Sequence, residues 1–526
     1  MMTAPSALLG LRGCLESLEN YPYSCLEQKV SALLPYLVAK KLILDFRLTS
    51  LSEKEINELI RKRLKEIIAF QKQIGGFSAW PDSGEISPFL TCYATYALIK
   101  AREAGFDFNP QILTRATDYL LSFVRSERKQ ARQPYGLRTF NSTRAYALYI
   151  LSLLKRPQPA LMERLYEERN NLSLFGKAYL LKAFHQSRIM DQAKEALTKE
   201  LLNKIKVTTG EAHFEDDEGR DGGWIFSSNG RTTAIILQAL IETGIDHPAL
   251  SAVAHWLVNR QLALFKDFFF STQENFYLFW ALSEFYRAKE KIAPDFRARF
   301  RLGERILVEE KFTPETREIK KARFNLEELT RKQRIRLAQE YPLKVEKEGR
   351  GTLYYGLKLN YVPAFQVPPR DEGIAVVKRI NPLDPGRKGR ASEEIKAGSL
   401  AVVTLEIAVP QELLYVVVED PLPAGFEAIN PSFLTESEEA QRKLEELIRA
   451  EPSKPRPWWS GFNHIERHDN RVILFADSLA PGVHVHHYLV RALNFGTYNI
   501  PGTRAEQMYA PEVFGRSPEM TIKIVK

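Results

Sequence analysis

The sequence predicts a multidomain fold of mixed class, in which an α/α toroid is followed by a β-rich connector and a β-sandwich. Up to about residue 305 apolar residues recur at helical spacing, whereas from about residue 352 they alternate with polar residues. The chain has 526 residues, which at ~150 residues per domain corresponds to three or four domains. Hydrophobic residues make up 44% and charged residues 26%, so the chain can bury sizeable cores and is not disordered.

Helices in the first half are indicated by stripes of apolar residues at positions i, i+3, i+4 and i+7. Such stripes occupy residues 30–38, 56–68, 113–124 and 250–258. Each stripe covers one face of a helix, and these faces are buried when helices pack on one another. We therefore expect paired amphipathic helices over this half.

A loose internal repeat runs through the same half. Loops that contain glycine precede helices dense in alanine and aromatic residues, at Gly75-Gly76-Phe77, Tyr135-Gly136-Leu137 and Gly222-Gly223-Trp224. A further helix of this kind, 276–285, lacks the glycines. Glycine permits a tight turn, and small residues let helices approach closely. Because the spacing is irregular, helices paired around a centre are favoured over a regular solenoid.

The second half is typical of a β-sandwich. Strands are predicted where apolar residues alternate or cluster in short runs, at 403–409, 415–418, 472–476, 488–493 and 521–525. Turns with proline and glycine separate them, as at Pro481-Gly482 and Pro501-Gly502. A helix over 436–449 interrupts the strands, and the charged stretch 311–350 is expected to be a connector with some β structure.

Charge and cysteine content argue against nucleic-acid binding and against a disulfide framework. The net charge is +9, but basic and acidic residues are interspersed, so a solvated surface is favoured over nucleic-acid binding. The three cysteines, Cys14, Cys25 and Cys92, are too few for a disulfide framework, and an odd count leaves at least one unpaired.

No membrane span, signal peptide, metal site or cofactor site is expected in this chain. The longest apolar run, 32–39, contains Pro35 and is far shorter than the ~20 residues of a span. The first thirteen residues lack a basic region. A histidine group, 484–487, has no obvious further ligand, and the acidic stretch 215–221 lacks EF-hand spacing.

The most distinctive stretch is Tyr-Pro-Tyr-Ser-Cys-Leu-Glu-Gln at 21–28, directly before the first amphipathic helix. Cys25 therefore lies near a helix N-terminus, where the helix dipole favours a thiolate. Gln28 follows at i+3 on the same face, so the sulfur can reach its carboxamide. Attack of the thiolate on that amide, with loss of ammonia, gives an internal thioester. The spacing is common by chance, and the alternative is a small buried cysteine at a helix start.

This stretch resembles the thioester motif of bacterial α2-macroglobulins, whose core is Cys-x-Glu-Gln followed by a helix. Residues 414–430 and 501–515 resemble the C-terminal macroglobulin domain of the same family. The resemblance covers nearly the whole chain. It implies a thioester domain over 1–305, a connector that is part of a CUB-like β domain over 306–362, and a macroglobulin-like β-sandwich over 363–526.

The family implies roles for several residues. Cys25 and Gln28 would form the thioester, with Cys25 as the leaving group when a nucleophile attacks the Gln28 acyl carbon. Leu26 and Glu27 complete the motif, and we assign Glu27 no catalytic act. The family also implies that the thioester bond is shielded from water by Tyr21, Met508 and Tyr509. The alternatives are a hydrophobic staple for Tyr21 and ordinary domain packing for Met508 and Tyr509.

The motif departs from the family in one mild respect, since Ser24 stands where glycine is common. No histidine precedes His185, which favours amines such as lysine side chains over hydroxyls as targets. The family implies a non-enzymatic endopeptidase inhibitor with a role in defence or colonisation, whose partners are target proteases captured covalently. Because this chain begins almost at the motif, we expect it to be the C-terminal portion of a larger or split system. An upstream chain with macroglobulin domains and a bait region is then a further expected partner.

Localisation follows from the family as periplasmic or at the cell surface, with cell-envelope association. Three other functions stay open. An α/α-toroid enzyme, such as a cyclase, prenyltransferase or polysaccharide lyase, needs a carboxylate cluster, a zinc set or a catalytic base, and no Asp-x-Asp-Asp occurs. A Cys-His hydrolase with Cys25 as nucleophile needs a nearby histidine. The last is a non-catalytic interaction remnant.

Overall fold

The computed structural model divides into two compact units, Met1–Leu359 and Asn360–Lys526. It describes residues 1–6, 9–21, 24–126, 136–208, 210–216, 225–263, 271–289, 293–303, 305–316, 320–325, 342–357, 367–383, 394–429, 442 and 461–526. The side chains of residues 9, 10, 261–263 and 510–512 are not described. Gly222-Gly223-Trp224, Tyr135 and nearly all of the predicted helix 436–449 lie outside these ranges.

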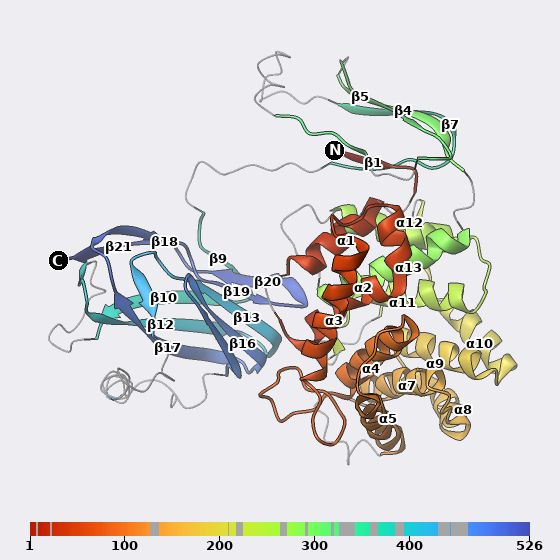
Figure 1. Cartoon of the computed structure of the whole chain (residues 1–526), viewed down its shortest axis with the longest axis horizontal. Coiled ribbons are helices and arrows are strands. Elements are labelled where there is room, and N and C mark those ends of the chain that lie inside the picture. The colour runs from red at the N-terminus through yellow and green to blue at the C-terminus, as the bar shows by residue number, and fades with distance from the viewer. Residues whose placement is uncertain are drawn as a thin grey trace. The chain divides into compact units, whose positions relative to one another are not determined.

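The helices of the first unit, labelled in Figure 1, form an inner ring by their contacts, with further helices packed outside it. The inner helices contact one another in a closed order: α2 (Leu26–Asp45), α4 (Pro88–Glu103), α7 (Leu137–Leu153), α9 (Leu174–Ser187), α11 (Asn229–Glu242), α13 (Thr272–Lys289) and α2 again. The outer helices are α1 (Leu9–Glu19), α3 (Glu53–Ile68), α5 (Pro110–Arg125), α8 (Pro159–Glu167), α10 (Asp191–Leu202) and α12 (Ala249–Ala263). A short 3-10 helix, Arg169–Asn171, and a hairpin of β2 (Lys206–Thr208) and β3 (Glu211–His213) complete this part. The predicted α/α toroid is confirmed.

The sequence explains the difference between the inner and the outer helices. The outer helix α3 buries one stripe and begins with a capping box between Ser52 and Glu55. Inner helices are buried almost all round, as in α4, where thirteen of sixteen residues are buried. Their many alanine, serine and threonine residues allow close packing on both sides.

A small β part of the first unit joins the chain's beginning to the connector. Strand β1 (Met2–Ala4) pairs with β6 (Lys320–Lys321) and β8 (Tyr354–Gly356), and β4 (Asp295–Leu302) pairs with β5 (Arg305–Phe312) and β7 (Leu343–Arg350). Phe296, Phe300 and Phe312 form a shared core, against which Met1 and Leu353 pack. We propose that these strands form one domain into which the helical ring is inserted.

The second unit is a β-sandwich. One sheet has the order β15-β16-β13-β19-β20-β9, a second has β10-β12-β17-β14, and a third has β11-β21-β18. The strands are β9 (Arg370–Glu372), β10 (Ala375–Pro382), β11 (Glu394–Lys396), β12 (Leu400–Val409), β13 (Leu413–Pro421), β14 (Phe426–Ala428), β15 (His464–His468), β16 (Arg471–Leu479), β17 (Gly482–Ala492), β18 (Gly496–Ile500), β19 (Arg504–Gln507), β20 (Ala510–Arg516) and β21 (Met520–Val525). The predicted strands fall on β12, β13, β16, β17 and β21.

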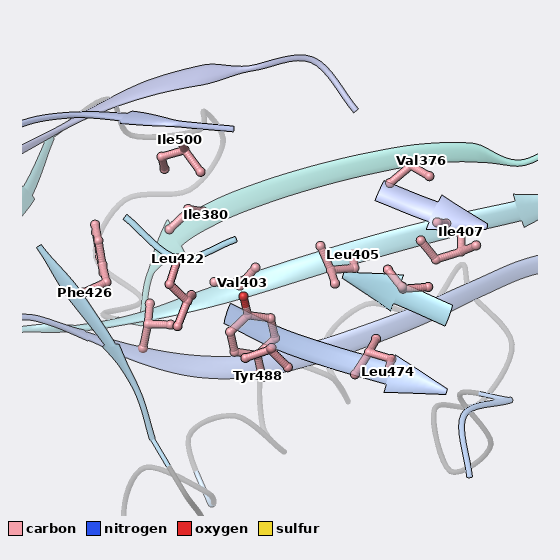
Figure 2. Packing of buried hydrophobic residues seen from close by; sticks show 14 of the residues in the cluster. Val376, Ile380, Val403, Leu405, Ile407, Leu422, Phe426, Leu474, Tyr488 and Ile500 are labelled. Carbon is pink, nitrogen blue, oxygen red and sulfur yellow. The ribbon is translucent and has the colours of Figure 1, made fainter. Parts of the chain in front are cut away.

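Figure 2 shows the core of this unit, where side chains from all three sheets meet. Within it lies a buried ion pair between Lys378 Nζ and Asp420 Oδ1, at 2.6 Å. Thr503 and Tyr488 also donate hydrogen bonds to the Asp420 carboxylate. The charge of Lys378 and the hydroxyl donors together compensate the burial of the carboxylate.

Candidate functional site

Cys25 stands at the N-cap of α2, with extended backbone angles of φ −69° and ψ 170°. Its neighbour Leu26 donates its N–H to the carbonyl of Ala79 at 3.0 Å, which fixes the start of the helix against the loop after α3. In that loop Phe77 and Trp80 are buried. Cys25 is only 6% exposed, so its sulfur lies at the start of the helix in a place shielded from water.

The carboxamide of Gln28 folds back over the first turn of α2. The backbone N–H of Cys25 donates to Gln28 Oε1 at 2.8 Å, and the two residues form a capping box. Gln28 is 3% exposed, and its Nε2 has no hydrogen-bond partner. The carboxamide therefore lies beside Cys25. Its oxygen accepts a hydrogen bond from the Cys25 N–H, which can stabilise negative charge on that oxygen, and its nitrogen has no hydrogen-bond partner.

Glu27 is fully buried and joins three inner helices at this end of the ring. Ser31 of α2 and Thr272 of α13 both donate hydroxyl hydrogen bonds to its carboxylate. The Ser31 hydroxyl also hydrogen-bonds Tyr93 of α4, at 2.7 Å between the oxygens. Burial raises the pKa of Tyr93 well above its usual value, and the charges of Tyr277 and Glu27 add to this. Glu27 thus fixes the first turn of α2 against α13.

The shielding residues fall in different parts of the chain. Tyr21 is half-buried just before the motif, whereas Pro22 and Tyr23 lie outside the described residues. Met508 and Tyr509 belong to the second unit, where the Met508 N–H donates to the carbonyl of Tyr415 at 2.9 Å. The Tyr509 ring stands edge-on to Tyr415, with centroids 5.3 Å apart. The shielding of the thioester by these residues stays a prediction.

The other two cysteines are fillers of the helical core. Cys14 on α1 and Cys92 on α4 are fully buried, and burial raises the pKa of each thiol well above its usual value. None of the three cysteines forms a disulfide. Among the described residues, no group of three histidine, cysteine or acidic side chains is placed to hold a metal ion. None of the described helices is long and apolar enough to cross a membrane.

Two buried cations inside the ring were missed by sequence reasoning. Lys182 on α9 is fully buried, bonds Gln238 at 2.6 Å and pairs with Glu242 at 3.2 Å, and burial lowers its pKa to about 8. Its ammonium lies 4.2 Å from the ring centroid of Tyr149. Arg231 on α11 is also fully buried. In the sequence, each of these residues is a basic residue within a helix of mainly small and apolar residues. The periodicity of apolar residues does not indicate whether such a basic residue is buried.

Residues 5–130 match the family model of the A-macroglobulin TED domain, and residues 373–512 match that of the bacterial alpha-2-macroglobulin MG10 domain. The chain belongs to the bacterial alpha-2-macroglobulin family. It is 28% identical over 85% of its length to an alpha-2-macroglobulin homolog of Nostoc, and 23% identical over 96% of its length to Escherichia coli alpha-2-macroglobulin. It spans 22% and 28% of the length of these two relatives.

Solved alpha-2-macroglobulins share the fold. A Salmonella alpha-2-macroglobulin mutant matches all of this chain over 31% of its own length, with a TM-score of 0.77 and 22% identity. A native Escherichia coli structure spanning domain MG7 to the C-terminus matches all of this chain over 77% of its own, with a TM-score of 0.76 and 19% identity. The chain therefore has the architecture of the C-terminal part of this family.

Proposed function

We propose that the chain carries an internal thioester between Cys25 and Gln28, and that it captures proteases covalently without being an enzyme itself. The observation that carries this proposal is the buried capping box, in which the Gln28 carboxamide lies against Cys25 at a helix N-terminus. The helix dipole favours the thiolate, and the Cys25 N–H stabilises charge on the carboxamide oxygen during attack.

The chemistry balances within the two side chains. The Cys25 thiolate adds to the Gln28 carboxamide carbon, the C–N bond breaks, and ammonia leaves with the thiol proton. An incoming amine then attacks the acyl carbon, forms an amide with Gln28 and releases the Cys25 thiol. Between these steps the bond must be kept from water, for which we propose Tyr21, Met508 and Tyr509 as an apolar cover.

The targets and surroundings follow from the same proposal. Lysine amines are the preferred nucleophiles, since amine attack needs no histidine to redirect the acyl group. The chain spans 22–28% of its first relatives, so a bait region and further macroglobulin domains would be supplied by other residues. We place the protein in the periplasm or at the cell surface, where it acts as an endopeptidase inhibitor in defence or colonisation.

Intact-mass spectrometry tests the thioester directly. The purified chain should be lighter than its sequence mass by one ammonia, and methylamine should add to Gln28 while freeing the Cys25 thiol. A Salmonella alpha-2-macroglobulin has been crystallised after reaction with methylamine, which makes this amine the natural probe. Gln28→Ala should keep the full mass and present a free Cys25 thiol from the start.

A matched control uses Cys92, which is buried on α4 and belongs to no capping box. Cys92→Ala should retain the loss of ammonia, whereas Cys25→Ala should abolish it. A wild-type chain of full mass, with Cys25 alkylated before methylamine is added, would refute the proposal. Hydrolysis of a general protease substrate by wild type, lost in Cys25→Ala, would then favour the Cys-His hydrolase, and no hydrolysis the non-catalytic remnant.

A further inference from the structure

A second feature lies at the same end of the inner ring as Cys25 and Gln28. Helices α2, α11 and α13 begin side by side there, because Glu27 of α2 bonds Thr272 of α13 and Gln273 of α13 bonds Arg231 of α11. Arg231 has no exposed surface. It is therefore a cation held inside a helical ring, which is rare unless an anion compensates it.

The contacts of Arg231 occupy only one side of its guanidinium. Nη1 donates to the carbonyl of Ile225 and to Gln273 Oε1, the latter at 2.8 Å. The guanidinium carbon lies 4.8 Å from the ring centroid of Phe175 and 5.6 Å from that of Phe89. The aromatic faces attract the cation, but they accept no conventional hydrogen bond from its N–H groups.

The other side of the guanidinium is buried without partners. Nε and Nη2 of Arg231 have no hydrogen bond, and neither does Nε2 of the adjoining Gln273. Leaving buried donors unpaired costs free energy for each group, more for a charged one. The unpartnered atoms belong to two side chains that are in contact, since Gln273 Oε1 accepts a hydrogen bond from Arg231 Nη1.

Nearby carboxylates are engaged elsewhere. Glu274 pairs with Arg260 at 2.7 Å and accepts from Ser228. Asp216 pairs with Arg138 at 2.5 Å and accepts from the backbone of Leu174. Within the described ranges no carboxylate forms an ion pair with Arg231.

We propose that Arg231 and Gln273 bind one small planar monovalent anion of the carboxylate class. Nε and Nη2 form the edge of a guanidinium that receives the two oxygens of a carboxylate side by side. Gln273 Nε2 supplies a further donor, and the N-termini of α11 and α13 add favourable partial charge. Complete burial limits the ligand to a few atoms, so formate is the probe.

The first test is the thermal unfolding midpoint of the whole chain, with formate replacing another monovalent salt at constant ionic strength. The wild-type midpoint should rise saturably, by about 2–5 °C well above the dissociation constant. Arg231→Gln should lose this rise. Gln273→Glu brings a carboxylate to the guanidinium, and it should raise the midpoint without formate and remove the response.

Arg144→Gln is the matched control, because Nε and Nη2 of this partly buried arginine already donate hydrogen bonds to the carbonyl of Val124. It should respond to formate as wild type does. The response should also persist in Cys25→Ala, so failure of the thioester and failure of this site are distinguishable. A wild-type midpoint unaffected by formate, or an equal rise in Arg231→Gln, would overturn the proposal.

Crystals of the wild-type chain grown with formate provide a measurement that does not depend on the variants folding. Planar density bridging Arg231 Nε and Nη2 and reaching Gln273 Nε2 supports the site. Density for water molecules only at these atoms would overturn it.

Discussion

Replacement of Glu27 by glutamine should loosen the part of the helical ring that holds Cys25 and Gln28. The Glu27 carboxylate accepts hydroxyl hydrogen bonds from Ser31 and Thr272 in a fully buried position. Glutamine keeps the shape, but it has one acceptor oxygen and no charge. One charge-assisted bond is lost and the other is weakened, so we expect about 2–4 kcal/mol of lost stability for the ring.

The buried thiols of Cys14 and Cys92 provide the assay, because both lie in the helical ring and become alkylated only when it opens. Urea titration with a brief alkylation pulse then gives the free energy of unfolding of this unit. The fraction of chain that has lost ammonia, read from the same mass spectra, should fall in Glu27→Gln, since the first turn of α2 is less well held.

Glu55→Gln is the matched control, because Glu55 accepts the hydroxyl and the N–H of Ser52 in an exposed capping box on α3. Solvent replaces those bonds, so its effect should be much smaller. If Glu27→Gln unfolds at the same urea concentration as Glu55→Gln and loses as much ammonia as wild type, the positioning of α2 by Glu27 is refuted.

Three further outcomes are expected, each read from unfolding curves of the full chain. Lys378→Met should destabilise the second unit by about 3–5 kcal/mol by stranding Asp420, and a second change, Asp420→Asn, should recover part of the loss. Gly176→Ala should destabilise the ring by about 1–3 kcal/mol, since the added carbon would lie 2.6 Å from Ser142 Oγ. Burial lowers the pKa of His486 to about 3, so this side chain takes up a proton more readily in the unfolded chain than in the folded one. The stability of the fold should therefore fall as the pH drops from about 6.5 towards 3, and it should fall less in His486→Phe. An unchanged midpoint in any of the three would contradict the packing described.

Local geometry explains what could be predicted from the sequence. The meeting of Cys25 and Gln28 follows from the i, i+3 spacing at a helix start, and the strand β12 follows from its alternation. The outer helices and the inner ring follow from apolar stripes and small-residue helices. For the contact of Cys25 with Gln28 and for β12, the deciding residues lie within a few positions of one another along the chain.

Features that depend on distant residues were not predicted. Strand β1 has only three residues and pairs with the distant segment Tyr354–Gly356. Three residues are too few for an alternating pattern that would predict a strand. The bond between Glu27 and Thr272 joins residues 245 positions apart. Arg231 looks like any helical cation in sequence, and its burial depends on how six helices close around it.

The pairing of β1 with β8 has a mechanical consequence. The chain leaves the small β part at Ala4, runs through all the helices and returns to it at Asp295, so the helical ring is anchored at both of its ends. If the proposed capture takes place and a bound protein pulls on Gln28, the force divides between two attachments of the ring instead of passing through one.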